Sequence, residues 1–234
     1  MKIAVDLHIH SALSPCADND MTPNNIVNMA VLKGLDAIAV TDHNSCSNVE
    51  AVMKVAGDRI LVLPGMEVQS REDVHLLCYF SSLEALFKFD SYIRKHMNGM
   101  QNISEIFGNQ YIMDEFDRIT GERKDMLLSS INLSVERIVQ LTYDIGGVVV
   151  PAHVDRPSYS IISQLGFIPP DLNIRVLEFS HKNESIVSEM QEYQHIISSD
   201  AHSLGEILER IMFLEVKDLS TTAIIQWLGC PCVI

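Results

Sequence analysis

The stretch Asp6-Leu7-His8-Ile9-His10 decides how this chain of 234 residues folds. An apolar run at residues 3–5 leads into it, so the sequence predicts a strand over residues 3–9. Residues two apart on a strand point to the same side, and we therefore expect His8 and His10 to project together. Imidazoles are typical ligands of zinc, manganese and iron. The opening of the chain thus predicts a strand that ends in metal ligands.

Histidines and carboxylates also stand at the ends of other short apolar runs. A parallel α/β fold gathers strand ends at one face, so segments far apart in the sequence can supply one metal cluster. A lone histidine on a strand is more often packed than ligating, but here the pattern recurs. The recurrences are Thr41-Asp42-His43-Asn44, Gly65-Met66-Glu67, Asp73-Val74-His75, Pro151-Ala152-His153 and Ser199-Asp200-Ala201-His202.

Apolar runs alternate with stretches of helical spacing along most of the chain, which favours an α/β barrel with right-handed crossovers in a single domain, residues 1–234. Thr22-Pro23 is expected to open a helix that ends at Gly34, and capping boxes are expected at 47–50 and 81–84. Further helices are predicted at 82–97, 134–144 and after Ser203. The remaining predicted strands are 36–41, 60–66, 74–80, 146–150, 174–179, 195–199 and 211–215.

Residues 83–133 interrupt this alternation. The part from 98 to 130 is polar, contains three glycines and shows no clear strand pattern. We interpret 83–133 as a helical insertion between barrel strands that serves as a lid or an oligomer contact. A surface embellishment without function is the alternative.

Composition limits the partners of the chain. The formal net charge is -14, and such a charge disfavours nucleic acid, which is usually gripped by clusters of Lys and Arg. A small phosphorylated substrate stays compatible with the negative charge, because bound cations reverse the local potential.

No apolar stretch of the sequence approaches the roughly 18 residues of a membrane helix. The start of the chain lacks a signal-peptide pattern and the five cysteines are an odd number, which predicts reduced thiols and a cytoplasmic location. The oligomeric state is not predicted.

The motifs resemble the PHP family, named for polymerase and histidinol phosphatase. The resemblance rests on residues 6–11 and 41–43, on Glu67, His75 and His153, and on residues 200–202, and it extends from residue 3 to about 215 outside the insertion. It implies a distorted (β/α)7 TIM-like barrel that holds two or three divalent transition metals. Members of the family hydrolyse phosphate esters, among them histidinol phosphate and nucleotides, or act as proofreading exonucleases beside bacterial replicative polymerases.

The resemblance also implies a ligand set for each metal. His8, His10, Glu67 and Asp200 would hold the first ion. Glu67, His75 and His153 would hold the second, with Glu67 bridging, and His43 and His202 the third. The family usually adds Asp or His five or six residues after the second histidine of the opening motif, where this chain has Pro15 and Cys16. Cys16 would favour zinc or iron. Asp18 is the alternative ligand, and a site with only two ions is another.

Three further residues are expected to take part in catalysis. The expected reaction is in-line attack on phosphorus by a hydroxide that bridges the metals. Arg156 is the candidate cation for the phosphoryl oxygens, since a guanidinium matches phosphate as a two-pronged donor. Asp42 is expected to orient a ligating imidazole, and His181 to protonate the leaving alcohol. A surface ion pair and an exposed loop histidine are the alternatives for Arg156 and His181.

The sequence therefore predicts a metal-dependent phosphoesterase with zinc, manganese or iron that acts on a small phosphorylated metabolite or nucleotide. A 3′–5′ exonuclease on single-stranded nucleic acid is one alternative, and a non-catalytic regulatory module that binds metals is another. An amidohydrolase on C–N bonds is a third, although it usually needs a bridging lysine, for which Lys182 is the late candidate. Cys230 and Cys232 are expected to pack in the terminal segment.

Overall fold

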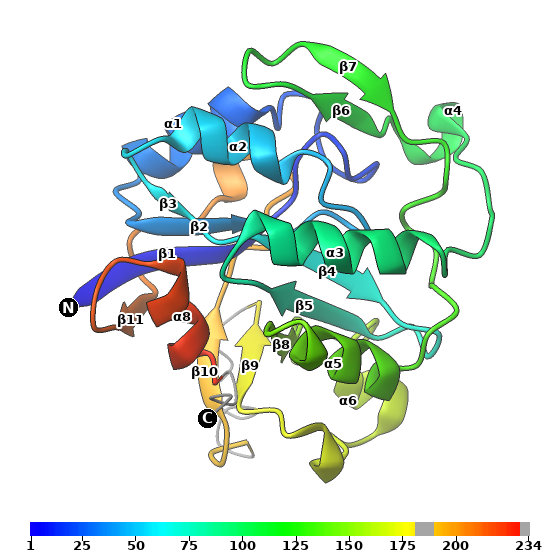
Figure 1. The fold of residues 1–234 in the computed structure, drawn as a ribbon, viewed down its shortest axis with the longest axis vertical. Helices are drawn as coiled ribbons and strands as arrows, with labels where there is room; N and C mark the ends of the chain where they lie inside the picture. The colour runs from blue at the N-terminus through cyan, green and yellow to red at the C-terminus, as the bar shows by residue number, and fades with distance from the viewer. Residues whose placement is uncertain (181–189, 230–234) are drawn as a thin grey trace.

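The computed structural model describes residues 1–180 and 190–229 and shows a mixed α/β fold (Figure 1). Its central strand is β1 (Lys2–Ile9), in which every residue after Lys2 is buried. A strand buried on both faces needs neighbours at its edges and layers above and below. It pairs in parallel with β2 (Ala37–Val40) and antiparallel with β11 (Phe213–Glu215), while β3 (Leu61–Val62) extends the sheet beyond β2.

A second sheet lies beside the first and is antiparallel throughout. β4 (Gly65–Gln69) and β5 (His75–Tyr79) form a hairpin, and β8 (Val148–Pro151) pairs with the other edge of β5. The prediction of right-handed crossovers is therefore wrong for β4 and β5, because a short turn joins them directly. In a third sheet, β9 (Val176–Phe179) and β10 (Gln194–Ile197) run parallel, as expected for the predicted α/β alternation.

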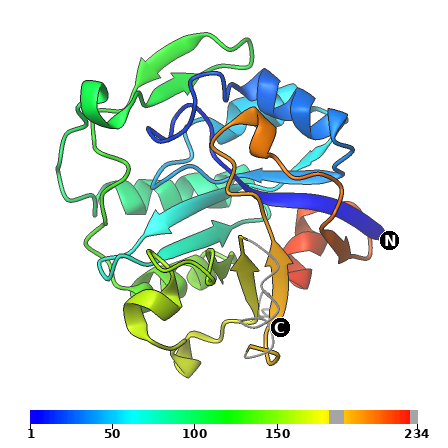
Figure 2. The same cartoon turned by 180° about the vertical axis from the view of Figure 1, so that it is seen from behind.

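Two isolated bridges connect the sheets at the ends of their strands. His43 pairs with Glu67, and Ile9 pairs with Ala201, both in parallel orientation. Both views show the sheet that contains β1 beside the sheet that contains β4 and β5 (Figure 1 and Figure 2). Within residues 1–180 and 190–229 the hydrogen-bonded sheets do not close into a barrel, so the seven-stranded barrel stays a prediction.

The helices cover the outer faces of the sheets. Hydroxyl caps begin most of them, as predicted for Thr22: the side chains of Thr22, Ser82, Ser134, Ser160 and Ser220 each accept a backbone N–H from the first turn. None of these helices is long and apolar enough to cross a membrane within the part of the chain described here. The helices are α1 (Pro23–Leu32), α2 (Val49–Ala56), α3 (Leu83–Arg94), α4 (Ser104–Phe107), α5 (Val135–Asp144), α6 (Ile161–Leu165) and α8 (Thr221–Trp227), with 3-10 turns η1 (Pro170–Leu172) and η2 (Leu204–Glu206).

The capping box predicted at 47–50 is wrong. Asn48 is the residue before α2, yet its side chain makes no capping hydrogen bond. Its amide instead donates to Ser11 Oγ (2.9 Å) and to Tyr111 O (3.0 Å), and its carbonyl accepts the N–H of Met113 (2.9 Å). Asn48 therefore links segments that the sequence places far apart.

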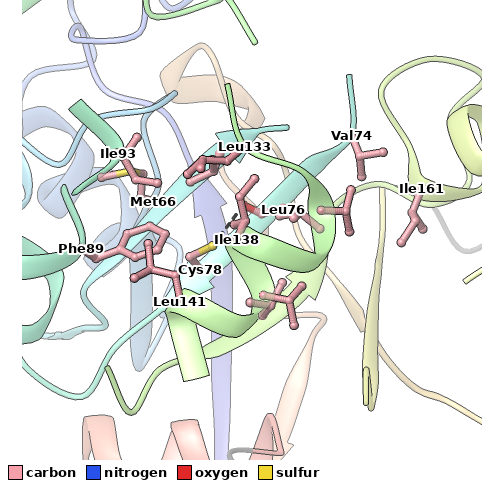
Figure 3. Close-up of a cluster of buried hydrophobic side chains, with 14 of the residues drawn as sticks. Met66, Val74, Leu76, Cys78, Phe89, Ile93, Leu133, Ile138, Leu141 and Ile161 are labelled. Atoms are coloured by element: carbon pink, nitrogen blue, oxygen red, sulfur yellow. Dashed lines mark hydrogen bonds between the residues drawn. The ribbon is translucent and has the colours of Figure 1, made fainter. Parts of the chain in front are cut away.

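Helix α3 packs into the hydrophobic core. Phe89 and Ile93 of α3 pack with Ile138 and Leu141 of α5 over the buried face of β4 and β5 (Figure 3). Each such side chain contributes about 1.5–3 kcal/mol on burial. The insertion of 83–133 stays a prediction, and α3 within it contributes to the core.

The rest of that segment contains a β-hairpin, which corrects the prediction that it lacks strands. β6 (Tyr111–Met113) and β7 (Ile119–Glu122) pair antiparallel at the edge of the molecule (Figure 1). The N–H of Tyr111 donates to Ala12 O at 2.9 Å. Gly108 has φ +100°, and a Cβ there would lie 2.0 Å from the carbonyl oxygen of Pro15. The hairpin segment therefore packs against the loop that follows β1.

Candidate metal centre

The end of β1 presents a histidine pair, as its alternation predicts. His8 and His10 are fully buried, and their Nε2 atoms lie 3.1 Å apart. Both nitrogens also lie close to Asp200 Oδ1, at 3.2 Å from His8 and 3.0 Å from His10. Strand β1 therefore brings two imidazoles and a distant carboxylate to one point.

The carboxylate of Glu67 occupies the middle of the cluster. Glu67 lies in β4 and is 1% exposed. Its Oε1 lies 2.9 Å from His75 Nδ1, and its Oε2 lies 2.8 Å from His43 Nδ1. Nitrogens of three further imidazoles lie 3.4 Å from these oxygens: those of His8, His10 and His153.

These short distances are not ordinary hydrogen bonds. Within the described chain, both oxygens of Glu67 and Nδ1 of His43, which faces them, are buried without a hydrogen-bond partner. Buried polar atoms normally have a partner, so a set of them facing one another fits ligands that share ions. Three overlapping groups have ligand atoms within 4.8 Å of one another: His8, His10 and Asp200; His43, Glu67 and His75; His10, His43 and His202. The donor set of imidazoles and carboxylates suits divalent transition metals.

Cys16 lies beside the third group, and the choice between Cys16 and Asp18 as a ligand stays open. Burial raises the pKa of the Cys16 thiol, but hydrogen bonds with His202 and His43 outweigh it and lower the pKa from 9.0 to about 7. Cys16 and Asp18 are both exposed residues, and the backbone N–H of Asp18 donates to His202 O at 2.8 Å. The thiol of Cys16 therefore faces the two imidazoles.

Burial and the charges of neighbouring groups shift the pKa values within the cluster in different directions. Burial raises the pKa of Glu67, but His75, His8 and His43 reverse this and hold the pKa well below its usual value. Burial lowers the pKa of His8, but Glu178, Asp200 and Glu67 raise it well above the usual value. Burial, His202 and His43 hold the pKa of His10 well below its usual value. The carboxylates are thus ionised, as metal ligands must be.

Outer residues fix the orientation of the histidines, and sequence reasoning missed two of them. Glu178 lies in β9, and its Oε2 accepts the backbone N–H of His153 at 2.8 Å. Ser14 Oγ donates to Asp42 Oδ1 (2.7 Å) and lies 2.9 Å from His10 Nδ1. Asp42 therefore reaches the His10 imidazole through Ser14, and its role in orienting a ligating imidazole stays a prediction. A buried acid within the apolar strand of β9 was a signal for Glu178; Ser14 gave none.

A cavity of about 130 Å³ opens over the cluster. Arg156, Ser158 and Tyr159 line it together with the histidines and carboxylates. The Arg156 guanidinium binds Asp200 Oδ2 and keeps 39% of its side chain exposed. The structure thus brings Arg156 to the site, whereas His181 and Lys182 lie outside the described residues, as do Cys230 and Cys232.

The sequence matches one known protein family over most of its length. The model of the PHP domain matches residues 6–204. The chain belongs to the PHP domain family. Its histidine and carboxylate clusters could hold metal ions. The resemblance of the sequence motifs to this family is confirmed.

Individual relatives share less of the sequence. Over 163 residues the chain is 26% identical to an uncharacterized protein of Methanocaldococcus jannaschii, a match that covers 70% of this chain and 18% of the archaeal one. The fold is similar to that of the lesion-specific endonuclease EndoQ of Pyrococcus furiosus, with a TM-score of 0.75 and 21% identity over 97% of this chain and 56% of EndoQ. The PHP-domain chain thus spans only part of both relatives.

Two smaller proteins match along nearly their whole length. A Bifidobacterium adolescentis protein assigned as a metal-dependent phosphoesterase has a TM-score of 0.59 and 17% identity, over 98% of this chain and 97% of the other. An amidohydrolase from Chromobacterium violaceum has a TM-score of 0.60 and 20% identity, over 93% of both chains. Identities this low show a shared fold. Because one structure of EndoQ holds a duplex with an abasic lesion, the comparisons do not support the expectation that nucleic acid is disfavoured.

Proposed function

We propose that this PHP-domain chain hydrolyses phosphate esters with two or three divalent transition metals, which are zinc, manganese or iron. The observation that carries the proposal is the position of Glu67, whose two buried oxygens lie within 3.4 Å of five imidazoles and lack hydrogen-bond partners in the described chain. A carboxylate in this position suits a bridge between two ions. The distorted seven-stranded barrel remains our proposal for the arrangement of the strands around it.

Each ion has its own group of ligands in this proposal. The first group contains His8, His10 and Asp200, whose ligand atoms meet at the end of β1. The second contains His75 and His153, and Glu67 joins it to the first. The third contains His43, His202 and Cys16, with a thiolate in place of the carboxylate or imidazole that the family usually has.

Metals bound in these groups would supply positive charge and Lewis acidity to a phosphoryl group. The chain adds a cation of its own in Arg156, whose guanidinium lines the cavity and is held by Asp200. A planar guanidinium can donate to two phosphoryl oxygens at once. Arg156 would therefore orient the phosphate group and offset the charge that develops on it.

The size of the cavity limits what can enter. Its volume is about 130 Å³. That space accommodates a phosphate group and not a whole substrate. The leaving group would therefore extend outward past Ser158 and Tyr159, which suits a small phosphorylated metabolite or a nucleotide.

A panel of phosphoesters tests the proposal. Protein loaded separately with zinc, manganese or iron is assayed on p-nitrophenyl phosphate and several dozen phosphorylated metabolites, and turnover is expected with at least one metal. His8→Ala should lose more than about 100-fold in kcat/KM, with a circular dichroism spectrum near that of the wild type. His96→Ala is the matched control, since His96 stacks on Tyr92 outside the centre. Undiminished turnover in His8→Ala contradicts the assigned site.

A nuclease is the second candidate, and the similarity to EndoQ is the observation in its favour. The formal net charge of -14 counts against it. Labelled single-stranded oligonucleotides test the 3′–5′ exonuclease, and a duplex with an abasic site tests lesion cleavage. Oligonucleotide cleavage without activity on small esters would establish the nuclease. Metal-loaded protein that is inactive on both kinds of substrate would indicate the non-catalytic metal-binding module.

A further inference from the structure

Tyr159 is a large aromatic residue at the mouth of the cavity, and the reaction described so far gives it no role. Its ring stacks on the ring of His75, with centroids 4.7 Å apart and planes 18° from parallel. The residue nevertheless remains 45% exposed. One side of the ring is thus covered by a residue of the centre, while much of the side chain faces solvent beside the cavity.

The backbone holds Tyr159 in an unusual conformation. Its φ is +58°, in the left-handed region where a bulky side chain is a true outlier. Strain of this kind persists only where the surroundings impose it, and it gathers at functional sites. The position of the ring is therefore imposed by the fold.

Hydrogen bonds fix the loop on both sides of Tyr159. The carbonyl of Tyr159 accepts the N–H of His75 at 2.8 Å. Ser160 Oγ donates to the carbonyl of Arg156 at 2.8 Å, and Ser160 also caps α6. The N–H of Val154 donates to Glu178 O at 2.9 Å. The loop 154–160 is therefore organised before any substrate arrives, and it places Arg156 and Tyr159 at the same opening.

We propose that Tyr159 is the specificity-determining residue of a leaving-group subsite, where it stacks on a flat ring carried by the leaving group of the phosphoester. The inference rests on the proposed phosphoesterase function. With the phosphate against Arg156, the leaving group passes along the exposed part of Tyr159. An aromatic face in this place favours substrates with a planar ring, such as a nucleobase or another heteroaromatic group, over esters of aliphatic alcohols.

A matched pair of substrates isolates this contact. Adenosine 5′-monophosphate and ribose 5-phosphate share the phosphate and the sugar and differ in the flat base. Stacking of one base on an aromatic side chain is strong enough to predict a wild-type preference of about ten-fold or more in kcat/KM for the nucleotide. Tyr159→Phe keeps the flat ring and should keep the preference. Tyr159→Leu should reduce the preference to near unity, whatever its absolute activity.

Controls separate this role from support of His75. Phe116→Leu is the matched control, because Phe116 is 68% exposed between β6 and β7 and is not among the residues that line the cavity; it should keep the preference. Metal content and circular dichroism of Tyr159→Leu identify a variant that has lost the centre itself. If Tyr159→Leu loses activity on both substrates in equal proportion, Tyr159 only positions His75 and the proposal is overturned. The same follows if the wild type shows no preference.

The same assays test the phosphoesterase function separately from the subsite at Tyr159. Wild-type protein that hydrolyses both substrates equally well retains the phosphoesterase function and refutes the subsite. Wild-type protein that hydrolyses no phosphoester refutes the function. In that case isothermal titration calorimetry measures the dissociation constants of adenosine 5′-monophosphate and ribose 5-phosphate for metal-loaded wild type and Tyr159→Leu. The ratio of the two constants in each protein still decides whether Tyr159 binds the base.

Discussion

Glu178 Oε1 lies 3.0 Å from His8 Nδ1, although the two residues are 170 positions apart in the chain. A carboxylate can only accept in this pair, so Nδ1 of the imidazole carries a proton, and Nε2 is the atom that points toward Glu67 and Asp200. The other oxygen of Glu178 accepts the N–H of His153. One buried acid thereby positions residues from two different sheets.

Glu178→Gln should weaken metal binding by about 10–100-fold. The amide keeps one acceptor but loses the charge that favours the required His8 tautomer. Competition with a chelating indicator measures the affinity for zinc and manganese. Glu215→Gln, on the exposed side of β11, is the control and should bind as the wild type does. Equal affinities for wild type and Glu178→Gln would show that Glu178 does not tune the centre.

The thiol of Cys16 should ligate the third ion. Protein loaded with cobalt(II) should then show the intense near-ultraviolet absorption of thiolate-to-cobalt charge transfer, which Cys16→Ser removes. Cys46→Ala should retain it, since Cys46 is buried away from the cluster. Cys16→Asp should shift the metal preference from zinc toward manganese, because carboxylates suit the harder ion. A wild-type spectrum without this absorption would instead favour a third site without the thiol.

Metal binding should release protons and strengthen as the pH rises. In the metal-free protein, burial lowers the pKa of His43, but Glu67 and Cys16 raise it well above 6.5, and the pKa of His8 is raised likewise. Both imidazoles are therefore protonated near pH 6.5, and an ion binds only after the protons leave. Affinity should rise as the pH increases from about 6.5. Calorimetry in buffers of different ionisation enthalpy counts the protons, and uptake in place of release would contradict the assignment.

Saturation with metal should stabilise the fold, because the ions bind a site that the unfolded chain lacks. At 100 times the dissociation constant the gain is about 2.7 kcal/mol. For a chain of this size it corresponds to a rise in Tm of roughly 5–10 °C. Differential scanning fluorimetry with and without zinc or manganese measures it. Glu67→Gln should show a smaller rise, and an unchanged Tm in saturated wild type would count against a built metal site.

Much of the centre could be predicted from the sequence because its residues sit at the ends of apolar strands. Alternation along β1 sends His8 and His10 to one side, and the parallel bridges bring His43 and Ala201 to the same edge. Glu178 and Ser14 were missed because both act through imidazoles and belong to no ligand pattern of their own. Their roles depend on contacts between sheets that local periodicity does not encode.

The strand connections were harder to predict. The turn between β4 and β5 lacks a glycine and instead places Asp73 at φ +60°, so it carried no hairpin signal. In β7, Ile119 and Thr120 are exposed, and therefore no alternation of apolar and polar residues marks the strand. Apolar runs predicted the buried strands β1, β2 and β9 well, because burial on both faces requires such runs.

The positive φ angles at the centre have a consequence for the chain as a whole. His153, Tyr159 and Asp200 adopt φ of +30°, +58° and +51°, and each would be more relaxed as glycine. Replacing all three by glycine would ease the backbone while deleting an imidazole, an aromatic ring and a carboxylate from the active centre. Backbone strain and metal binding therefore act in opposite directions on stability at these positions, because residues that strain the chain also supply or flank the proposed ligands.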